Sequence, residues 1–174
     1  MLLMLIDDIN KALDNNCFFS ALTLALTLPD ICGKAEYPES KTSERYKKWY
    51  EEYIEKSEKY GVQALPYLSS NVVYSLRNYM LHQGTVYTDK INEFALIVED
   101  KKEWNSLTEM GGVITDSHGN TTTRYSVNVR RLCFLLCTYA KTYYNNNREK
   151  FDFFSCRIIK YDDTMPQPFT QIYP

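Results

Sequence analysis

The stretch LLMLIDDINKALDNNCFFSALTLALTL, residues 2–28, decides the fold. Its apolar residues recur every three or four positions, which is the spacing of one face of an α-helix. We therefore expect a long helix over residues 2–28 that turns this face to a core, and we expect Pro29 and Asp30 to end it. The face consists of Leu2, Ile6, Ile9, Leu13, Cys17, Ala21, Leu24 and Leu28.

The same spacing predicts three further helices, over residues 43–60, 65–83 and 127–147. A polar segment, PDICGKAEYPESKT, is expected to connect the first helix to Ser43, whose residue type commonly caps helices. The helix over 43–60 has an aromatic face, by which we expect it to dock on the core. The three apolar faces are Tyr46, Trp49, Tyr50, Tyr53 and Tyr60; Leu68, Val72, Leu76 and Tyr79; and Val129, Leu132, Cys133, Leu136, Cys137 and Ala140.

Residues 91–126 have a different pattern, in which β-branched runs such as INEFALIVE and TTTRYSV are separated by the turn formers of DSHGN. This pattern predicts a small antiparallel β-hairpin or sheet inserted into the bundle, with His118 exposed in a turn. A short strand is expected over residues 155–161. The predicted fold class is α+β, mainly α: one domain over residues 1–174, built on a helical bundle of about four helices.

Charge and composition restrict the function. Lys and Arg number 20 against 22 Asp and Glu, so the net charge is −2, and any polyanion would have to bind to a local basic patch. The longest apolar stretch, Cys17–Leu28, is shorter than the roughly 20 residues that span a bilayer, and the start MLLMLIDD has no basic leader. We expect a cytoplasmic protein that makes no membrane contact, with its cysteines reduced and mostly buried.

Several common site motifs are missing from the sequence. It has no phosphate-binding glycine loop, no Gly-x-Ser-x-Gly nucleophile turn, and no Cys and His pairs at zinc spacing. Cys133 and Cys137 lie four residues apart, but the chain has only two His, so we interpret this pair as core packing. The sequence therefore predicts neither a metal site nor a cofactor.

One motif stands out, in the string SLRNYMLHQG of residues 75–84. Arg77 is followed by Asn78, three more residues and then His82, which resembles the Arg-x(4 to 6)-His signature of HEPN domains. The resemblance covers roughly residues 64–84. The first 80 residues, with PDICGKAEYP followed by the motif helix, are also similar to uncharacterised bacterial proteins. The resemblance to HEPN domains implies a small helical domain that acts as a metal-independent endoribonuclease, commonly a homodimer with a composite cleft, in toxin–antitoxin or other defence systems. An antitoxin or another protein partner is then expected.

The residue types suit this chemistry. His82 can hold or release a proton near neutral pH, Arg77 can bind two phosphate oxygens, and Asn78 can position the phosphate or the imidazole. On a continuous α-helix, however, a separation of five residues turns by about 140°, so Arg77 and His82 would point to different sides. They would converge if the helix loosened near residues 81–84, or if a second copy crossed it; the resemblance implies the second copy.

Other residues have two interpretations each. Tyr74 and Tyr79 flank the motif and are candidates for stacking on bases, although core packing explains tyrosines equally well. Arg130 and Arg131 lie in a locally basic region that could guide RNA, or could form an ordinary solvated helix face. The alternative function is a non-catalytic HEPN-like module that binds a protein or a nucleotide.

Overall fold

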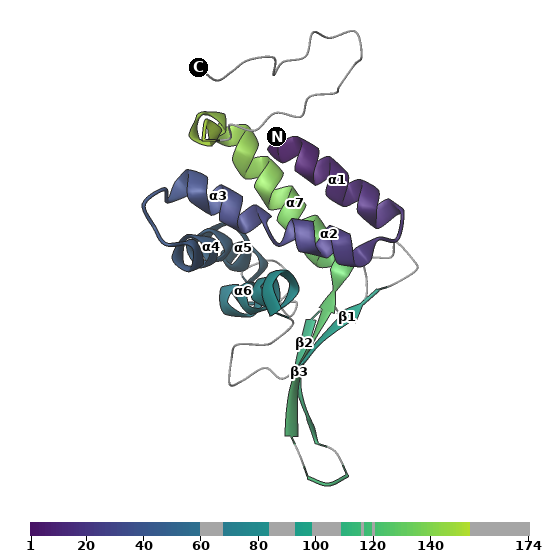
Figure 1. The fold of residues 1–174 in the computed structure, drawn as a ribbon. Coiled ribbons are helices and arrows are strands. Elements are labelled where there is room, and N and C mark those ends of the chain that lie inside the picture. The colour runs from purple at the N-terminus through teal and green to yellow at the C-terminus, as the bar shows by residue number, and fades with distance from the viewer. Residues whose placement is uncertain (60–67, 84–92, 99–108, 116, 120, 154–174) are drawn as a thin grey trace, which may run out of the picture.

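The computed structural model describes residues 1–59, 68–83, 93–98, 109–115, 117–119 and 121–153 of the chain (Figure 1). The α-helices there are α1 (Leu2–Asp14), α2 (Phe18–Ala25), α3 (Leu28–Glu36), α4 (Thr42–Tyr50), α5 (Lys56–Lys59), α6 (Ser70–Asn78) and α7 (Val129–Asn146). Two wide π-helical turns are η1 (Glu51–Glu55) and η2 (Tyr79–Gln83), and η3 (Arg148–Phe151) is a 3-10 turn. The strands are β1 (Glu93–Ile97), β2 (Glu109–Thr115) and β3 (Thr121–Asn128).

The helices form the body of the domain and the strands extend away from it (Figure 1). Helix α7 is the central element, because α1, α2 and α3 all pack against it. Helix α4 packs on α3 and also on α6, so it links the central helices to the helix that carries the motif. The expectation of a mainly helical α+β fold is confirmed at this level.

The expected single helix over 2–28 is wrong, because the chain bends twice within it. Asn16 has a φ of 57°, a left-handed conformation that asparagine tolerates, and this residue separates α1 from α2. A second break follows Ala25, and Pro29 then lies in the first turn of α3 rather than at the end of a helix. Proline suits a first turn because the backbone N–H it lacks has no intrahelical partner there. The segment expected to be a polar connection therefore contains α3.

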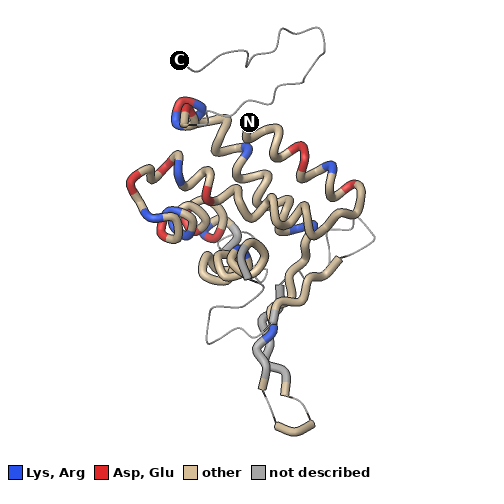
Figure 2. Tube along the Cα trace, in the orientation of Figure 1, with Lys and Arg blue, Asp and Glu red and all other residues tan. Residues whose placement is uncertain are grey.

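One stretch of the described residues, Phe18–Glu36, is long and apolar enough to cross a membrane by length and composition. That observation is weak evidence for a span, since the core helices of folded domains pass the same test. Here the stretch consists of α2 and α3 with a break between them, and Leu22, Leu26 and Cys32 are fully buried against the other helices. Figure 2 shows that α2 carries no charged residue, whereas both signs of charge occur along α1 and α4.

The sheet differs from the expected antiparallel arrangement. Its order is β1-β3-β2, and β1 runs parallel to β3, with Phe94 opposite Tyr125. Strand β2 pairs antiparallel with β3, so the sheet is mixed. An alternating pattern of residues shows which face of a strand is buried but not which way its neighbour runs, and this explains the error. His118 is exposed in the turn between β2 and β3, as predicted.

The other helices lie close to their predicted places. The helix expected over 43–60 begins at Thr42, and the π turn η1 interrupts it. Its aromatic face does dock on the core, since Tyr46, Trp49 and Tyr50 are buried. The helix expected over 65–83 is α6 followed by η2, and the helix expected over 127–147 is α7. The strand predicted over 155–161 lies outside the described residues.

Candidate functional site

The start of α6 is fixed by two carboxylates of the preceding π turn. Glu55 Oε2 accepts a hydrogen bond of 2.8 Å from the backbone N–H of Ser70, and Glu51 Oε1 accepts one of 2.9 Å from its hydroxyl. Ser69 adds a side-chain cap to the N–H of Val72. Negative charge is favourable at a helix N-terminus, where backbone N–H groups are unsatisfied. These contacts set the position of α6 against η1, and thereby that of the motif.

Helix α4 is held on α3 by a close backbone contact and an ion pair. A Cβ atom at Gly33 would lie 2.7 Å from the backbone oxygen of Arg45, so only glycine permits this approach. The Arg45 side chain donates from Nε and Nη2 to Oδ1 of Asp30, with both distances 2.8 Å. Both side chains are mostly buried, which strengthens the pair relative to an exposed one. These two contacts fix the position of α4 on α3, and with it the position of the residues that follow Arg45.

Tyr46 and Tyr74 join α4 to α6. Their ring centroids lie 5.2 Å apart in an edge-on arrangement at 64°. The Tyr46 side chain is fully buried, and its hydroxyl has no hydrogen-bond partner in the described part of the chain. Burial raises the pKa of the Tyr46 phenol, and the positive charge of Arg77 acts in the opposite direction. The Tyr46 hydroxyl is therefore a neutral polar group within the electrostatic reach of Arg77.

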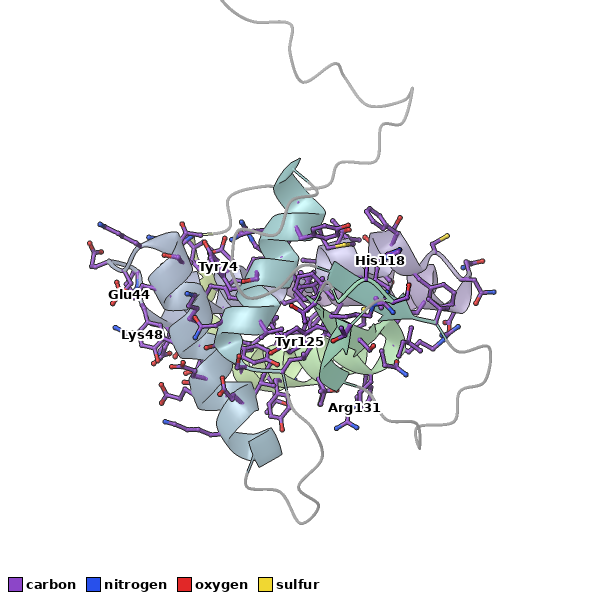
Figure 3. All side chains as sticks on the ribbon, turned by 90° about the horizontal axis from the view of Figure 1, so that it is seen from below. Glu44, Lys48, Tyr74, His118, Tyr125 and Arg131 are labelled. Atoms are coloured by element: carbon purple, nitrogen blue, oxygen red, sulfur yellow. The ribbon has the colours of Figure 1, made fainter. Side chains whose placement is uncertain are left out.

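Two cations from different helices lie over the ring of Tyr74. Lys47 Nζ of α4 is 5.2 Å from the ring centroid, and Arg77 Cζ of α6 is 6.0 Å from it. Such contacts attract a cation to the negative face of an aromatic ring. Figure 3 shows Tyr74 beside α6, further inside the molecule than Glu44 and Lys48 at the outer edge of α4. The structure thus brings Tyr74, a predicted site residue, together with Arg77.

Arg77 and Asn78 contact each other directly. Nη1 of the half-buried Arg77 donates a hydrogen bond of 3.0 Å to Oδ1 of Asn78. A guanidinium has five donors in a fixed plane, so this bond helps to orient the group. Two of the three predicted catalytic side chains are therefore in contact, at the end of α6.

The backbone widens just beyond Arg77, where α6 continues as the π turn η2. A π-helix bonds residue i to residue i+5, whereas an α-helix bonds i to i+4. The angle about the helix axis between two backbone positions five residues apart is consequently smaller here than the roughly 140° of a continuous α-helix. His82 lies within η2, and its side chain falls outside the described part of the structure.

The remaining predicted site residues lie elsewhere. Tyr79 packs toward the sheet, with its ring 5.9 Å from that of Phe94. Arg130 lies over Phe18 at 4.7 Å and donates to Oδ1 of Asn16, at the junction of α1 and α2. Arg131 is in the first turn of α7, and Figure 3 shows it well apart from Tyr74. Arg130 and Arg131 are thus not brought to the Arg77 region by this fold.

Sequence reasoning missed Lys47 as a site residue and took Tyr46 only as a docking residue. Both lie on a helix with many charges and tyrosines, and nothing in the spacing distinguishes them. Their relation to Arg77 arises only because α4 packs on α6. The signal is tertiary and could not be read from the sequence.

The charged clusters in the described ranges do not form a metal site: no group of three or more His, Cys, Asp or Glu residues there is arranged to hold an ion. Cys133 and Cys137 are buried in the core, as predicted. Comparison of the chain with models of protein families, with curated proteins and with solved structures gives no match.

Proposed function

We propose that this protein is a metal-independent endoribonuclease of the HEPN type, acting in the cytoplasm as a homodimer. Arg77 binds the scissile phosphate, His82 transfers protons, and Asn78 positions the guanidinium. The observation that supports the proposal most directly is the placement of Arg77. It is half-buried, bonded to Asn78 and lies over Tyr74, on a helix that widens before His82.

The proposed reaction needs three functions. The 2′-hydroxyl of the substrate attacks the adjacent phosphorus, the hydroxyl loses a proton, and the leaving 5′-oxygen gains one. Negative charge accumulates on the phosphorane oxygens during the attack. A guanidinium stabilises that charge through paired hydrogen bonds, and an imidazole with an unperturbed pKa near 6.5 can exchange protons at neutral pH. Because a proton must be both removed and supplied, two imidazoles of a dimer suit the reaction.

The small number of histidines also supports the proposal of a dimer. The chain has two His, and His118 is exposed in the distant turn between β2 and β3. A second copy that crosses α6 near η2 would supply the second His82 and a second Arg77. In this proposal the protein is a toxin or defence effector, and an antitoxin or another protein partner covers the same cleft.

The test measures cleavage of single-stranded RNA by the purified protein in the presence of EDTA. His82→Ala should reduce the rate by 100-fold or more, since a positioned acid or base contributes about 10² to 10⁴. Arg77→Ala should also reduce it by 100-fold or more, since loss of one donor to developing negative charge costs about 10² to 10³. Arg77→Lys should not restore activity, because an ammonium lacks the planar pair of donors. Chelation should leave the wild-type rate unchanged.

The chain offers matched controls for both substitutions. His118→Ala removes an exposed imidazole, and Arg148→Ala removes the guanidinium of an exposed arginine, the first residue of η3. Both controls should cleave RNA at the wild-type rate, and all variants should keep the wild-type melting temperature within about 2 °C. RNA cleavage that is equal in the wild type, Arg77→Ala and His82→Ala would reject the proposal and favour the non-catalytic binding module.

A further inference from the structure

Helix α4 carries three neighbouring cations, and they differ in what they contact. Arg45 is paired with Asp30, and Lys48 Nζ is 2.8 Å from a carboxylate oxygen of Glu44. Lys47 contacts the Tyr74 ring, and none of the described carboxylates is within ion-pair distance of it. The Lys47 side chain is half-buried, and its Nζ is placed by the contact with the Tyr74 ring. An uncompensated cation in such a place is a candidate for binding an anion.

Lys47 lies close to Arg77, so an anion bound by Lys47 would lie beside the Arg77 region. Nζ of Lys47 and Cζ of Arg77 lie 5.2 Å and 6.0 Å from the same ring centroid, so they are at most about 11 Å apart. Two successive anions on one chain can each contact one of these cations. The half-buried ring of Tyr74 contacts both cations.

We infer that Lys47 is a second phosphate-binding group of this site and contacts the backbone phosphate next to the one held by Arg77. The inference rests on the proposed function and names a residue, from a different helix, that extends the site along a single strand of RNA. The ligand chemistry is a phosphodiester chain, because a chain presents successive anions along its length. Lys47 does not take part in the proton transfers.

Salt dependence separates a phosphate contact from a structural role. For a single strand, the slope of log K against log salt concentration is about −0.7 for each phosphate contact. The probe is a fluorescent 2′-O-methyl oligoribonucleotide, which lacks the attacking hydroxyl and stays intact. Binding is measured by anisotropy between 0.05 and 0.5 M KCl, with the full-length wild type and each variant.

Lys47→Gln should reduce the magnitude of the slope by about 0.7 and weaken binding most at low salt. Lys47→Arg should keep the wild-type slope, because it retains the charge. The matched control is Lys48→Gln, which makes the same change of charge and shape one residue away on an ion-paired lysine. It should leave the slope unchanged, and a melting temperature for each variant checks folding.

Equal slopes for the wild type and Lys47→Gln would overturn the inference, as would failure of the wild type to bind the probe at 0.05 M KCl. The cleavage assay keeps the two proposals apart. If RNA is cleaved in an Arg77-dependent manner while the slopes are equal, the nuclease stands and the role of Lys47 fails. If Lys47→Gln changes the slope while no RNA is cleaved, the phosphate site stands and the nuclease fails.

Discussion

Replacing Tyr46 by Phe should stabilise this protein, although most substitutions at buried positions do the opposite. The Tyr46 side chain is 0% exposed, and its hydroxyl has no hydrogen-bond partner in the described residues. A buried polar group without a partner costs about 1–3 kcal/mol relative to an apolar group of the same shape. The ring contact with Tyr74 at 5.2 Å does not use the hydroxyl, so Phe should keep it. We expect a gain of about 1 kcal/mol in the free energy of unfolding.

Tyr143 provides the matched control, because its hydroxyl is bonded. This side chain is 3% exposed, and its hydroxyl donates to Glu36 Oε2 at 2.5 Å. Tyr143→Phe removes the same atom but breaks a hydrogen bond to a charged group, worth about 1.5–3 kcal/mol. It should therefore destabilise the protein. The two substitutions are chemically identical, and the structure predicts opposite signs for them.

The assay is equilibrium unfolding in urea, followed by circular dichroism at pH 7. With a slope m of about 2 kcal/mol/M, a gain of 1 kcal/mol moves the midpoint of Tyr46→Phe upward by about 0.5 M. The midpoint of Tyr143→Phe should move downward by at least as much. A fall in the midpoint for Tyr46→Phe, with m unchanged, would show that the buried hydroxyl does have a partner and would refute the reasoning.

Two more predictions concern the contacts that hold α3. Gly33→Ala should destabilise the protein by about 1–3 kcal/mol, because the new Cβ would lie 2.7 Å from the backbone oxygen of Arg45. Urea unfolding measures this change. An unchanged midpoint would mean that α3 and α4 can move apart at this contact without loss of stability. Burial acts to raise the pKa of Glu36, but hydrogen bonds from Lys150 and Tyr143 outweigh it and hold the pKa below its usual value. This carboxylate therefore adds stability above about pH 4.3 that is lost as the pH falls through its lowered pKa. Glu36→Gln should flatten the dependence of the urea midpoint on pH between 5 and 3, and a dependence as steep as the wild type's would contradict this assignment.

The sequence was most informative where a helix buries one face over several turns. The aromatic face of Tyr46, Trp49 and Tyr50 and the apolar face of α7 were both found from spacing alone. The same spacing failed over residues 2–28, because a helical period continues across a short break if the next helix packs on the same core. The break depends on one left-handed residue, Asn16, and apolar periodicity does not report backbone conformation.

The candidate site shows the same limit. Arg77, Asn78 and His82 were selected from a local string, and the contact between Arg77 and Asn78 is local as well. The wide turn η2 is a backbone feature without a side-chain pattern. The group formed by Tyr46, Tyr74 and two cations depends on the packing of α4 on α6, which no spacing within either helix encodes.

The wide turn η2 has a consequence for how this chain can change over generations. A wide turn corresponds to one extra residue accommodated within an ordinary helix. Deleting a single residue such as Met80 would allow the helix to become regular with little change in the direction of the backbone after it, but it would shorten the spacing from Arg77 to His82 from five residues to four. The fold can thus tolerate loss of the extra residue, whereas the spacing of the motif cannot. Related chains that keep the motif should keep the number of residues between its arginine and its histidine.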